Sequence, residues 1–516
     1  MSKSLPSRPS LEQLKTQAKE LLKELKSGEP AALQRFHESH PPGSDAENSP
    51  PDTRAWSLSD AQLVIAREYG AASWPKLRER VAAILVDTGD PMDLLRQAFA
   101  EDDAPLFRRL LERHPRLKAR IDEPVEAFNS PVITQARSRE MLDVLLDAGA
   151  NLNVRSNWWA GGFGLLDTAE PDLAHYAIAR GAEVTVHAAA RLGMTEKLRE
   201  LLATDPTLVH ARGGDGQTPL HFASTIAVAE LLLAHGADID ALDVDHESTP
   251  AQYMVRDRPD VARHLMQRGC RTDLLLAAAL GDDALVRRLL DANPESIRVR
   301  VTPEYFPKRD HHSGGTIYQW TLGWFISPHE VARKFGHADI LQLLMERSPA
   351  DVRFLAACWM ADETEIRQLL TQQPRLLSTL SPNDRRHVAL AARNNHTAAV
   401  RAMLAAGFPV NATGEHDGTP LHWAAFHGNA EMTREILQHA PPLEQTDRSF
   451  NGTPLGWAIH GSEHGWYAKT GDYAAVMELL LNAGAKLPPD SRKAPRRSGA
   501  CCGNSDDNSD IAEDLM

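Results

Sequence analysis

The sequence predicts an all-α repeat solenoid of about twelve helix pairs, joined by short β-hairpins or turns and preceded by a small helical domain. First, the 516 residues far exceed a typical domain of about 100–200 residues. Second, a motif that begins Thr-Pro-Leu recurs along the chain. Third, apolar residues recur at helical spacing in short segments that end in Gly-Ala. One such helix pair cannot bury its apolar face alone, so neighbouring pairs must stack.

Residues 1–88 form the predicted N-terminal helical module. Its first helix spans 11–26 and places six apolar residues on one face: Leu11, Leu14, Ala18, Leu21, Leu22 and Leu25. A Pro-rich linker is predicted near 40–52, and Trp74-Pro75 marks the start of a later helix. We expect the module to cap the first repeat, because terminal repeats need a polar outer surface. The alternative is a separate partner-binding domain.

Residues 89–487 hold the predicted repeats. The best copies of the motif are Thr218-Pro219-Leu220-His221, Thr419-Pro420-Leu421-His422 and Thr453-Pro454-Leu455. A threonine at a helix start accepts hydrogen bonds from free backbone N–H groups, and a proline in the first turn lacks an N–H that would have no partner. Each motif therefore predicts the first turn of a helix.

These motifs resemble the ankyrin repeat, whose T-P-L-H-x-A signature recurs about every 33 residues. Twelve repeats between Pro91 and Leu487 would average about that length. The resemblance implies that His221 and His422 are structural residues that hydrogen-bond the turn of the next repeat. The N-terminal module is similar to one found ahead of bacterial ankyrin arrays, which favours a bacterial origin.

Aromatic residues are concentrated in three segments that interrupt the repeats: 301–325, 460–473 and the loop 156–164. These segments hold five of the ten tryptophans, and long ordered loops are usually functional. By resemblance, the inner face of the best repeat would also present its last residues before Gly428. The partner-binding candidates are Trp158, Trp159, Phe163, Tyr305, Phe306, Tyr318, Trp320, Trp324, Phe426, His427, Trp466 and Tyr467. The alternative is that these rings pack on the array itself.

A catalytic site is not predicted. His460-Gly-Ser-Glu-His464 matches a zinc-protease pattern, but we expect Gly461 and Gly465 to interrupt the helix that this chemistry needs. His460 and His464 are kept only as metal candidates, and we expect His311 and His312 to be solvated. The sequence contains no P-loop or nucleophile-elbow motif, so no cofactor is predicted.

The formal net charge of −14 argues against nucleic acid or an anionic membrane as the partner. The chain has no apolar run long enough to span a bilayer and no visible signal peptide. Residues 488–516, with the Cys501–Cys502 pair, are predicted to be a disordered polar tail.

The predicted function is a cytoplasmic, non-catalytic scaffold that binds another protein. Three alternatives stay open: a metal-dependent enzyme or small-molecule binder built on the His and aromatic insertions, a purely structural array, and a secreted effector.

Overall fold

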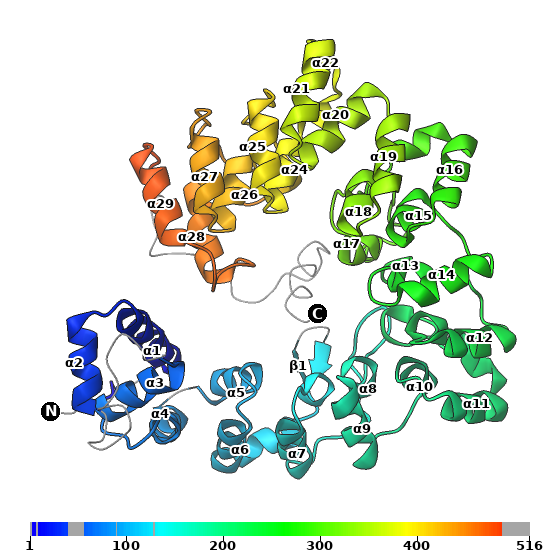
Figure 1. Ribbon diagram of the computed structural model, residues 1–516. Helices are drawn as coiled ribbons and strands as arrows, with labels where there is room; N and C mark the ends of the chain where they lie inside the picture. The colour runs from blue at the N-terminus through cyan, green and yellow to red at the C-terminus, as the bar shows by residue number, and fades with distance from the viewer. Residues whose placement is uncertain (1–2, 7–8, 40–55, 89, 127–128, 488–516) are drawn as a thin grey trace. The chain divides into compact units, whose positions relative to one another are not determined.

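The computed structural model describes residues 3–6, 9–39, 56–88, 90–126 and 129–487, and helices dominate it (Figure 1). The predicted all-α fold is confirmed. Among the described residues one small antiparallel sheet joins β1 (Pro124–Glu126) to β2 (Ser130–Pro131), so the other predicted hairpins are turns. The predicted linker at 40–52 and the predicted tail at 488–516 lie outside the described residues.

The chain divides into two compact units. The first contains residues 1–158 and 162–184, and the second contains 159–161 and 185–516. The helices of the first unit are α1 (Leu11–Lys26), α2 (Pro30–Ser39), α3 (Leu58–Glu68), α4 (Trp74–Thr88), α5 (Pro91–Ala100), α6 (Ala104–Arg113), α7 (Arg139–Asp147), α8 (Leu165–Thr168) and α9 (Pro171–Ala179), with 3-10 turns η2 (Pro115–Arg120) and η4 (Val132–Gln135).

The first helices of this unit surround a core of their own. Helix α1 begins at Ser10, whose hydroxyl accepts a hydrogen bond from the backbone N–H of Gln13. It buries the predicted leucine face, with Leu22 only partly covered, against α2 and α3. Helix α3 begins with a capping box between Ser57 and Asp60. Helix α4 contacts both α5 and α6, so the module packs directly on the helix pair that follows it.

The helices of the second unit follow the predicted repeat pattern. They are α10 (Val186–Arg191), α11 (Thr195–Thr204), α12 (Ile226–Ala234), α13 (Pro250–Met254), α14 (Pro259–Gln267), α15 (Leu274–Leu280), α16 (Asp283–Ala292), α17 (Tyr318–Thr321), α18 (Pro328–Lys334), α19 (Ala338–Arg347), α20 (Ala350–Trp359), α21 (Glu363–Gln372), α22 (Leu376–Thr379), α23 (Pro382–Arg385), α24 (His387–Arg393), α25 (Thr397–Ala405), α26 (Pro420–Phe426), α27 (Ala430–Leu437), α28 (Pro454–His464) and α29 (Tyr473–Asn482). The 3-10 turns are η5 (Pro206–His210), η6 (Gly214–Gly216), η7 (Pro219–Phe222), η8 (Pro294–Arg298) and η9 (Glu415–Asp417).

Two rows of helices stack within the second unit (Figure 1). The first helices of successive repeats, such as α24, α26 and α28, contact one another, and so do the second helices α25, α27 and α29. The paired alanines at 189–190, 278–279, 391–392 and 424–425 are buried between the first helices. Their small side chains allow the first helices of neighbouring repeats to approach closely.

The Thr-Pro-Leu motifs begin helices where the repeat has its full length. Thr419 caps α26 and Thr453 caps α28 through their side-chain oxygens. At Thr218 the motif forms only the short turn η7, and Thr225 then caps α12. This copy has too few residues between its two helical segments to complete a first α-helix.

Candidate functional site

The motif histidines clamp neighbouring repeats together. His221 Nδ1 accepts hydrogen bonds from the Thr218 backbone N–H (3.1 Å), and its Nε2 donates to the Ser248 carbonyl (3.2 Å). His422 makes the same contacts with Thr419 (3.2 Å) and Gly452 (3.1 Å). Burial lowers the pKa of His221 to about 3. Both nitrogens of each ring are occupied by backbone groups, which leaves no nitrogen for catalysis.

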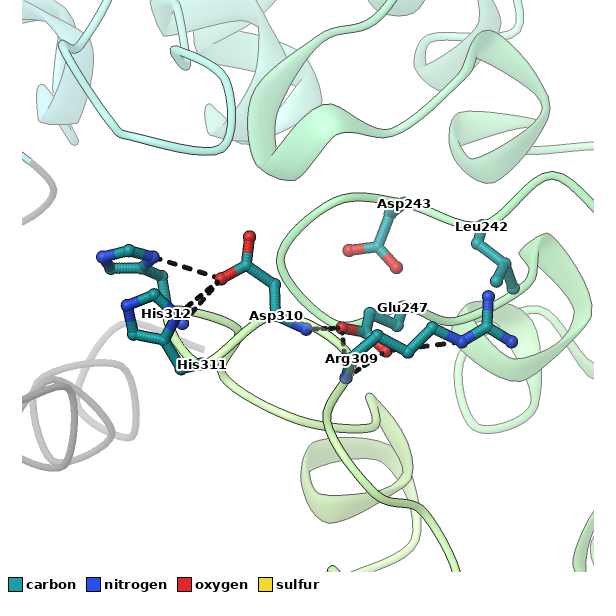
Figure 2. Close-up of a pocket in the computed structure, with 7 residues that line it drawn as sticks. All are labelled: Leu242, Asp243, Glu247, Arg309, Asp310, His311 and His312. Carbon is teal, nitrogen blue, oxygen red and sulfur yellow. Dashed lines mark hydrogen bonds and ion pairs between the residues drawn. The ribbon is translucent and has the colours of Figure 1, made fainter.

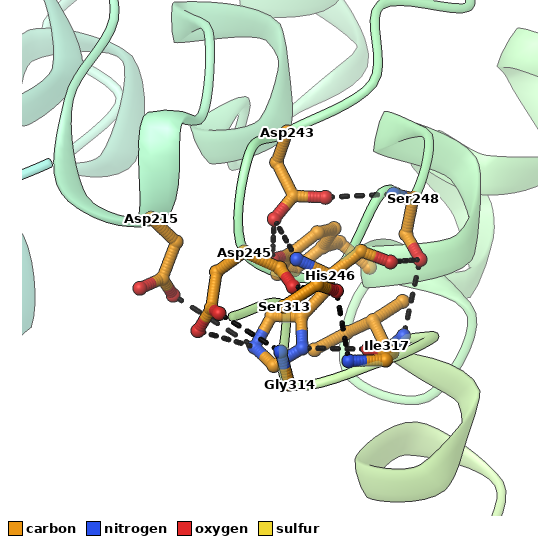
Figure 3. Close-up of polar contacts among 10 residues, drawn as sticks. Asp215, Asp243, Asp245, His246, Ser248, Ser313, Gly314 and Ile317 are labelled. Carbon is orange, nitrogen blue, oxygen red and sulfur yellow. Dashed lines mark hydrogen bonds and ion pairs between the residues drawn. The ribbon is translucent and has the colours of Figure 1, made fainter. Parts of the chain in front are cut away.

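The insertion at 301–325 folds onto the loop between α12 and α13. The backbone N–H groups of Arg309 and Asp310 donate to the Glu247 carboxylate at 2.8 Å. Further along, the Ile317 N–H donates to the Ser248 hydroxyl oxygen at 3.0 Å (Figure 3). The insertion is therefore held by a neighbouring repeat of the array.

Tyr318 is not an exposed anchor, which corrects the prediction made for it. Its side chain is fully buried, and its hydroxyl donates to Asp273 Oδ2 at 2.9 Å. The half-buried Phe306 packs its ring edge-on against Tyr318, with ring centroids 5.6 Å apart. Trp320 is also half-buried, whereas Tyr305 remains exposed. Some aromatic rings of the docked insertion therefore pack against one another in its interior.

A pocket of about 590 Å³ lies where this insertion meets the loop 242–247 (Figure 2). Its lining residues are Leu242, Asp243, Glu247, Arg309, Asp310, His311 and His312. The Asp310 carboxylate accepts hydrogen bonds from the His312 backbone N–H (2.9 Å) and ring Nδ1 (3.1 Å), which lower the pKa of Asp310. The side chain of His311 is 83% exposed, so these two histidines lie on the surface.

The loop 156–164 has one exposed ring. Trp159 is exposed, and its ring centroid lies 5.6 Å from that of His312. Trp158 and Phe163 are half-buried, and the Phe163 N–H donates to the Ser156 hydroxyl oxygen at 2.8 Å. Of the three predicted rings in this loop, Trp159 is the most exposed, and its ring lies beside that of His312.

Two predicted aromatic residues contact one arginine near the C-terminal end of the array, and a third packs against one of them. The guanidinium carbon of Arg393 lies 4.5 Å from the ring centroid of Trp324 and 5.1 Å from that of Trp466. Phe426 meets Trp466 edge-on, with centroids 5.4 Å apart. All three rings are half-buried, whereas Arg393 is buried and paired with Glu415 at 2.6 Å. We call these three rings, with Arg393, the aromatic surface.

Sequence reasoning missed Arg393. It ends α24, one repeat before Phe426, and nothing in its local sequence distinguishes it from the other helix-terminal arginines. The Asn394 side-chain amide, next in the chain, donates to the Trp324 carbonyl at 2.8 Å. The end of one insertion is thereby fixed beside the other insertion, at 460–473.

His427 lies beneath this surface, which corrects its prediction as an anchor. It is 2% exposed, and its Nε2 donates to the Arg393 carbonyl at 2.8 Å. Its ring stacks on the buried Trp423, and burial lowers the pKa of His427 to about 4. Tyr467 packs edge-on against His427 and remains 38% exposed, so Tyr467 extends the aromatic surface outward.

The metal candidates His460 and His464 lie on one uninterrupted helix, so the expected break at Gly461 is wrong. Helix α28 continues through Gly461 to His464, and it lies so close to α26 that a Cβ added at residue 461 would approach the Phe426 carbonyl oxygen to 2.3 Å. The two imidazole centroids are 5.0 Å apart. Within the described part of the chain, the clusters of three possible metal ligands are Asp310–His311–His312 and Asp215–Asp245–His246. Neither of these two clusters includes His460 or His464.

In the part of the chain that the structure describes, none of the helices is both long and apolar enough to cross a bilayer.

Short similarities link the chain to several curated proteins. It is 55% identical over 49 residues to "Serine/threonine-protein kinase VIK" of Arabidopsis thaliana, which is 9% of this chain and 11% of the relative. It is 33% identical to "Palmitoyltransferase AKR1" of Kluyveromyces lactis over 20% of this chain and 14% of the relative. It is 26% identical to "Ankyrin repeat and SAM domain-containing protein 6" of Mus musculus over 38% of this chain and 21% of the relative. The chain therefore spans at most about a fifth of these relatives.

A family model and a solved structure match larger parts of the chain. The crystal structure of the human ASB11 ankyrin repeat domain matches at 19% identity with a TM-score of 0.21, over 59% of this chain and 98% of that one. The family model described as "Ankyrin repeats (3 copies)" matches residues 186–275, 328–447 and 388–491. The matched segments coincide with the stacked helix pairs and both histidine clamps, so these repeats are ankyrin repeats.

Proposed function

We propose that the protein binds another protein, without catalysing a reaction, through the aromatic surface at the C-terminal end of the array. The observation that carries this proposal is the convergence of Trp324 and Trp466 on Arg393, with Phe426 packed edge-on against Trp466. Two of these rings come from different insertions and the third from α26. Ankyrin repeats as a class support a protein as the partner.

The composition of the aromatic surface suits a protein interface. Tryptophan, tyrosine and arginine dominate the residues that contribute most to protein binding. Aromatic side chains lose little rotamer freedom when they bind, and those of Trp324 and Trp466 are already held by neighbours. Arg393 is fixed by Glu415, so its charge polarises the rings without needing a new partner. The side chains of the aromatic surface are therefore preorganised for binding.

The cellular setting is also part of the proposal. We place the protein in the cytoplasm of a bacterium, with residues 1–88 as a cap on the array. The described cysteines, Cys270 and Cys358, are both buried free thiols, which suits a reducing compartment. The net charge of −14 argues against a polyanionic partner such as nucleic acid or an anionic membrane.

The test is affinity capture from native lysate with quantitative comparison of three forms of the chain. The surface variant carries Trp324→Ala and Trp466→Ala. The matched control carries Trp159→Ala and Tyr305→Ala, which remove two exposed aromatic rings elsewhere. Far-UV circular dichroism and melting curves establish that each form folds.

We expect a protein that is retained by the wild type and by the control and is lost from the folded surface variant. Equal retention by all three forms, or no retained protein for the wild type, would contradict the proposal.

A further inference from the structure

A histidine and two aspartates from successive repeats converge beneath the docked insertion (Figure 3). His246 Nε2 lies 3.7 Å from Asp245 Oδ2 and 4.0 Å from Asp215 Oδ2. The three side chains are only 12%, 8% and 14% exposed, respectively. The N–H groups of residues 244 and 245 donate to the Asp215 carbonyl, which fixes one loop beside the other. The cluster lies in the array, apart from the aromatic surface.

The insertion fixes which nitrogen of His246 carries a proton. His246 Nδ1 lies 2.9 Å from the Gly315 carbonyl oxygen. A carbonyl oxygen only accepts, so Nδ1 must be the protonated donor. In the neutral ring, Nε2 then presents a lone pair to the two carboxylates. Metal-binding histidines are commonly oriented in this way, with the other ring nitrogen donating to a backbone carbonyl.

Asp245 has the most buried side chain of the three, and one of its two carboxylate oxygens accepts a hydrogen bond from the protein. Its Oδ1 accepts a hydrogen bond from the Gly314 N–H at 3.0 Å. Within the described residues no hydrogen-bond donor reaches Oδ2, which faces His246 Nε2. A largely buried carboxylate is costly unless a positive charge lies beside it. A metal cation bound between the three side chains would supply that charge.

The spacing of the atoms favours a cation. A charge-assisted N–H to O bond has a length of about 2.7–2.9 Å, which is much shorter than 3.7 and 4.0 Å. Two ligands that each lie about 2.1 Å from a tetrahedral zinc ion are separated by about 3.4 Å. The two distances from His246 Nε2 would need to shorten by about 0.3 and 0.6 Å to reach that separation, and all three ligand atoms lie within 4.8 Å of one another.

We propose that Asp215, Asp245 and His246 bind a zinc ion, with the fourth ligand position left for water. One imidazole and two carboxylates form a ligand set that zinc accepts. The ion would join two successive repeats and, through Gly314 and Gly315, the insertion that covers them. This site does not depend on the proposed protein-binding function, because its ligands are not part of the aromatic surface.

Isothermal titration of the metal-free full chain with Zn²⁺ tests the site. Asp245→Asn keeps the Oδ1 acceptor for Gly314 and removes the charge, and Asp215→Asn is an equally conservative second variant. His311→Gln with His312→Gln is the matched control, because it removes the other imidazoles grouped with a carboxylate. X-ray absorption of the zinc-loaded wild type reports the ligand types, and circular dichroism reports folding.

We expect one tight equivalent of zinc in the wild type and in the control, bound by one imidazole nitrogen and oxygen ligands. Loss of a ligand should weaken binding about 100-fold or more, because even residues that only orient ligands contribute 10–100-fold. The proposal is overturned if the wild type binds no zinc. It is also overturned if both aspartate variants keep the affinity or if the control loses it.

Discussion

Replacing His221 by glutamine should remove one source of acid destabilisation from the repeat array. The ring is 1% exposed, accepts the Thr218 N–H at Nδ1 and donates to the Ser248 carbonyl from Nε2. A second proton would have to sit at Nδ1, where the Thr218 N–H already points. Burial and this bonding pattern both keep the folded-state ring neutral.

The expected size follows from the pKa of His221. The pKa falls from 6.5 to about 3 on folding, mainly because the buried ring loses solvation. A lowered histidine pKa means that the unfolded chain binds the proton first, so stability is complete above pH 6.5 and is lost as the pH falls from 6.5 towards 3. Each pH unit in that window is worth about 1.4 kcal/mol. Acidification from pH 7 to pH 5 should therefore cost about 2 kcal/mol at this residue.

Urea unfolding of wild type and His221→Gln at pH 7 and pH 5 measures this contribution. At pH 7 the variant should be less stable by about 1–3 kcal/mol, because it loses buried hydrogen bonds. At pH 5 the difference in unfolding free energy should shrink by about 2 kcal/mol. Other titrating groups are shared by both proteins and cancel from the comparison. An equal difference at both pH values would refute the account of His221 as a neutral clamp.

Two further substitutions test the packing of the insertions. Tyr318→Phe removes the hydrogen bond to Asp273 and should lower the free energy of unfolding in urea by about 1–3 kcal/mol without changing protein capture; an unchanged urea midpoint would contradict the buried assignment. Gly461→Ala places a Cβ 2.3 Å from the Phe426 carbonyl oxygen and should cost about 1–3 kcal/mol, measured as a lower melting temperature. A Gly461→Ala variant as stable as the wild type would show that α28 does not approach α26 so closely.

The repeat architecture could be predicted from sequence because its signals are local. The spacing of apolar residues in 11–26 predicts α1 directly. Thr419-Pro420 predicts the start of α26, because threonine caps a helix with its side chain and proline lacks the backbone N–H that would have no partner there. The hydrogen bond from His422 to the next repeat also follows once the repeat is recognised. Each of these features depends on residues within about one repeat length.

The functional surfaces could not be predicted in the same way, because they depend on where the insertions dock. Nothing near Tyr318 in the sequence shows that Asp273, 45 residues earlier in the chain, accepts a hydrogen bond from its hydroxyl group. Gly461 was expected to break a helix, but contact with the Phe426 carbonyl makes glycine the residue that fits there. The role of Arg393 depends on Trp324 and Trp466, which two separate insertions bring beside its guanidinium group.

Site-specific photo-crosslinking tests the central claim most directly. A photoreactive phenylalanine analogue replaces Tyr467, which is exposed beside the aromatic surface, or Ile226, which is exposed on α12. Both forms are irradiated in native lysate with the captured protein bound. Binding through the aromatic surface predicts a covalent adduct with that protein from position 467 and none from position 226. An adduct from position 226 alone, or none from position 467, would contradict it.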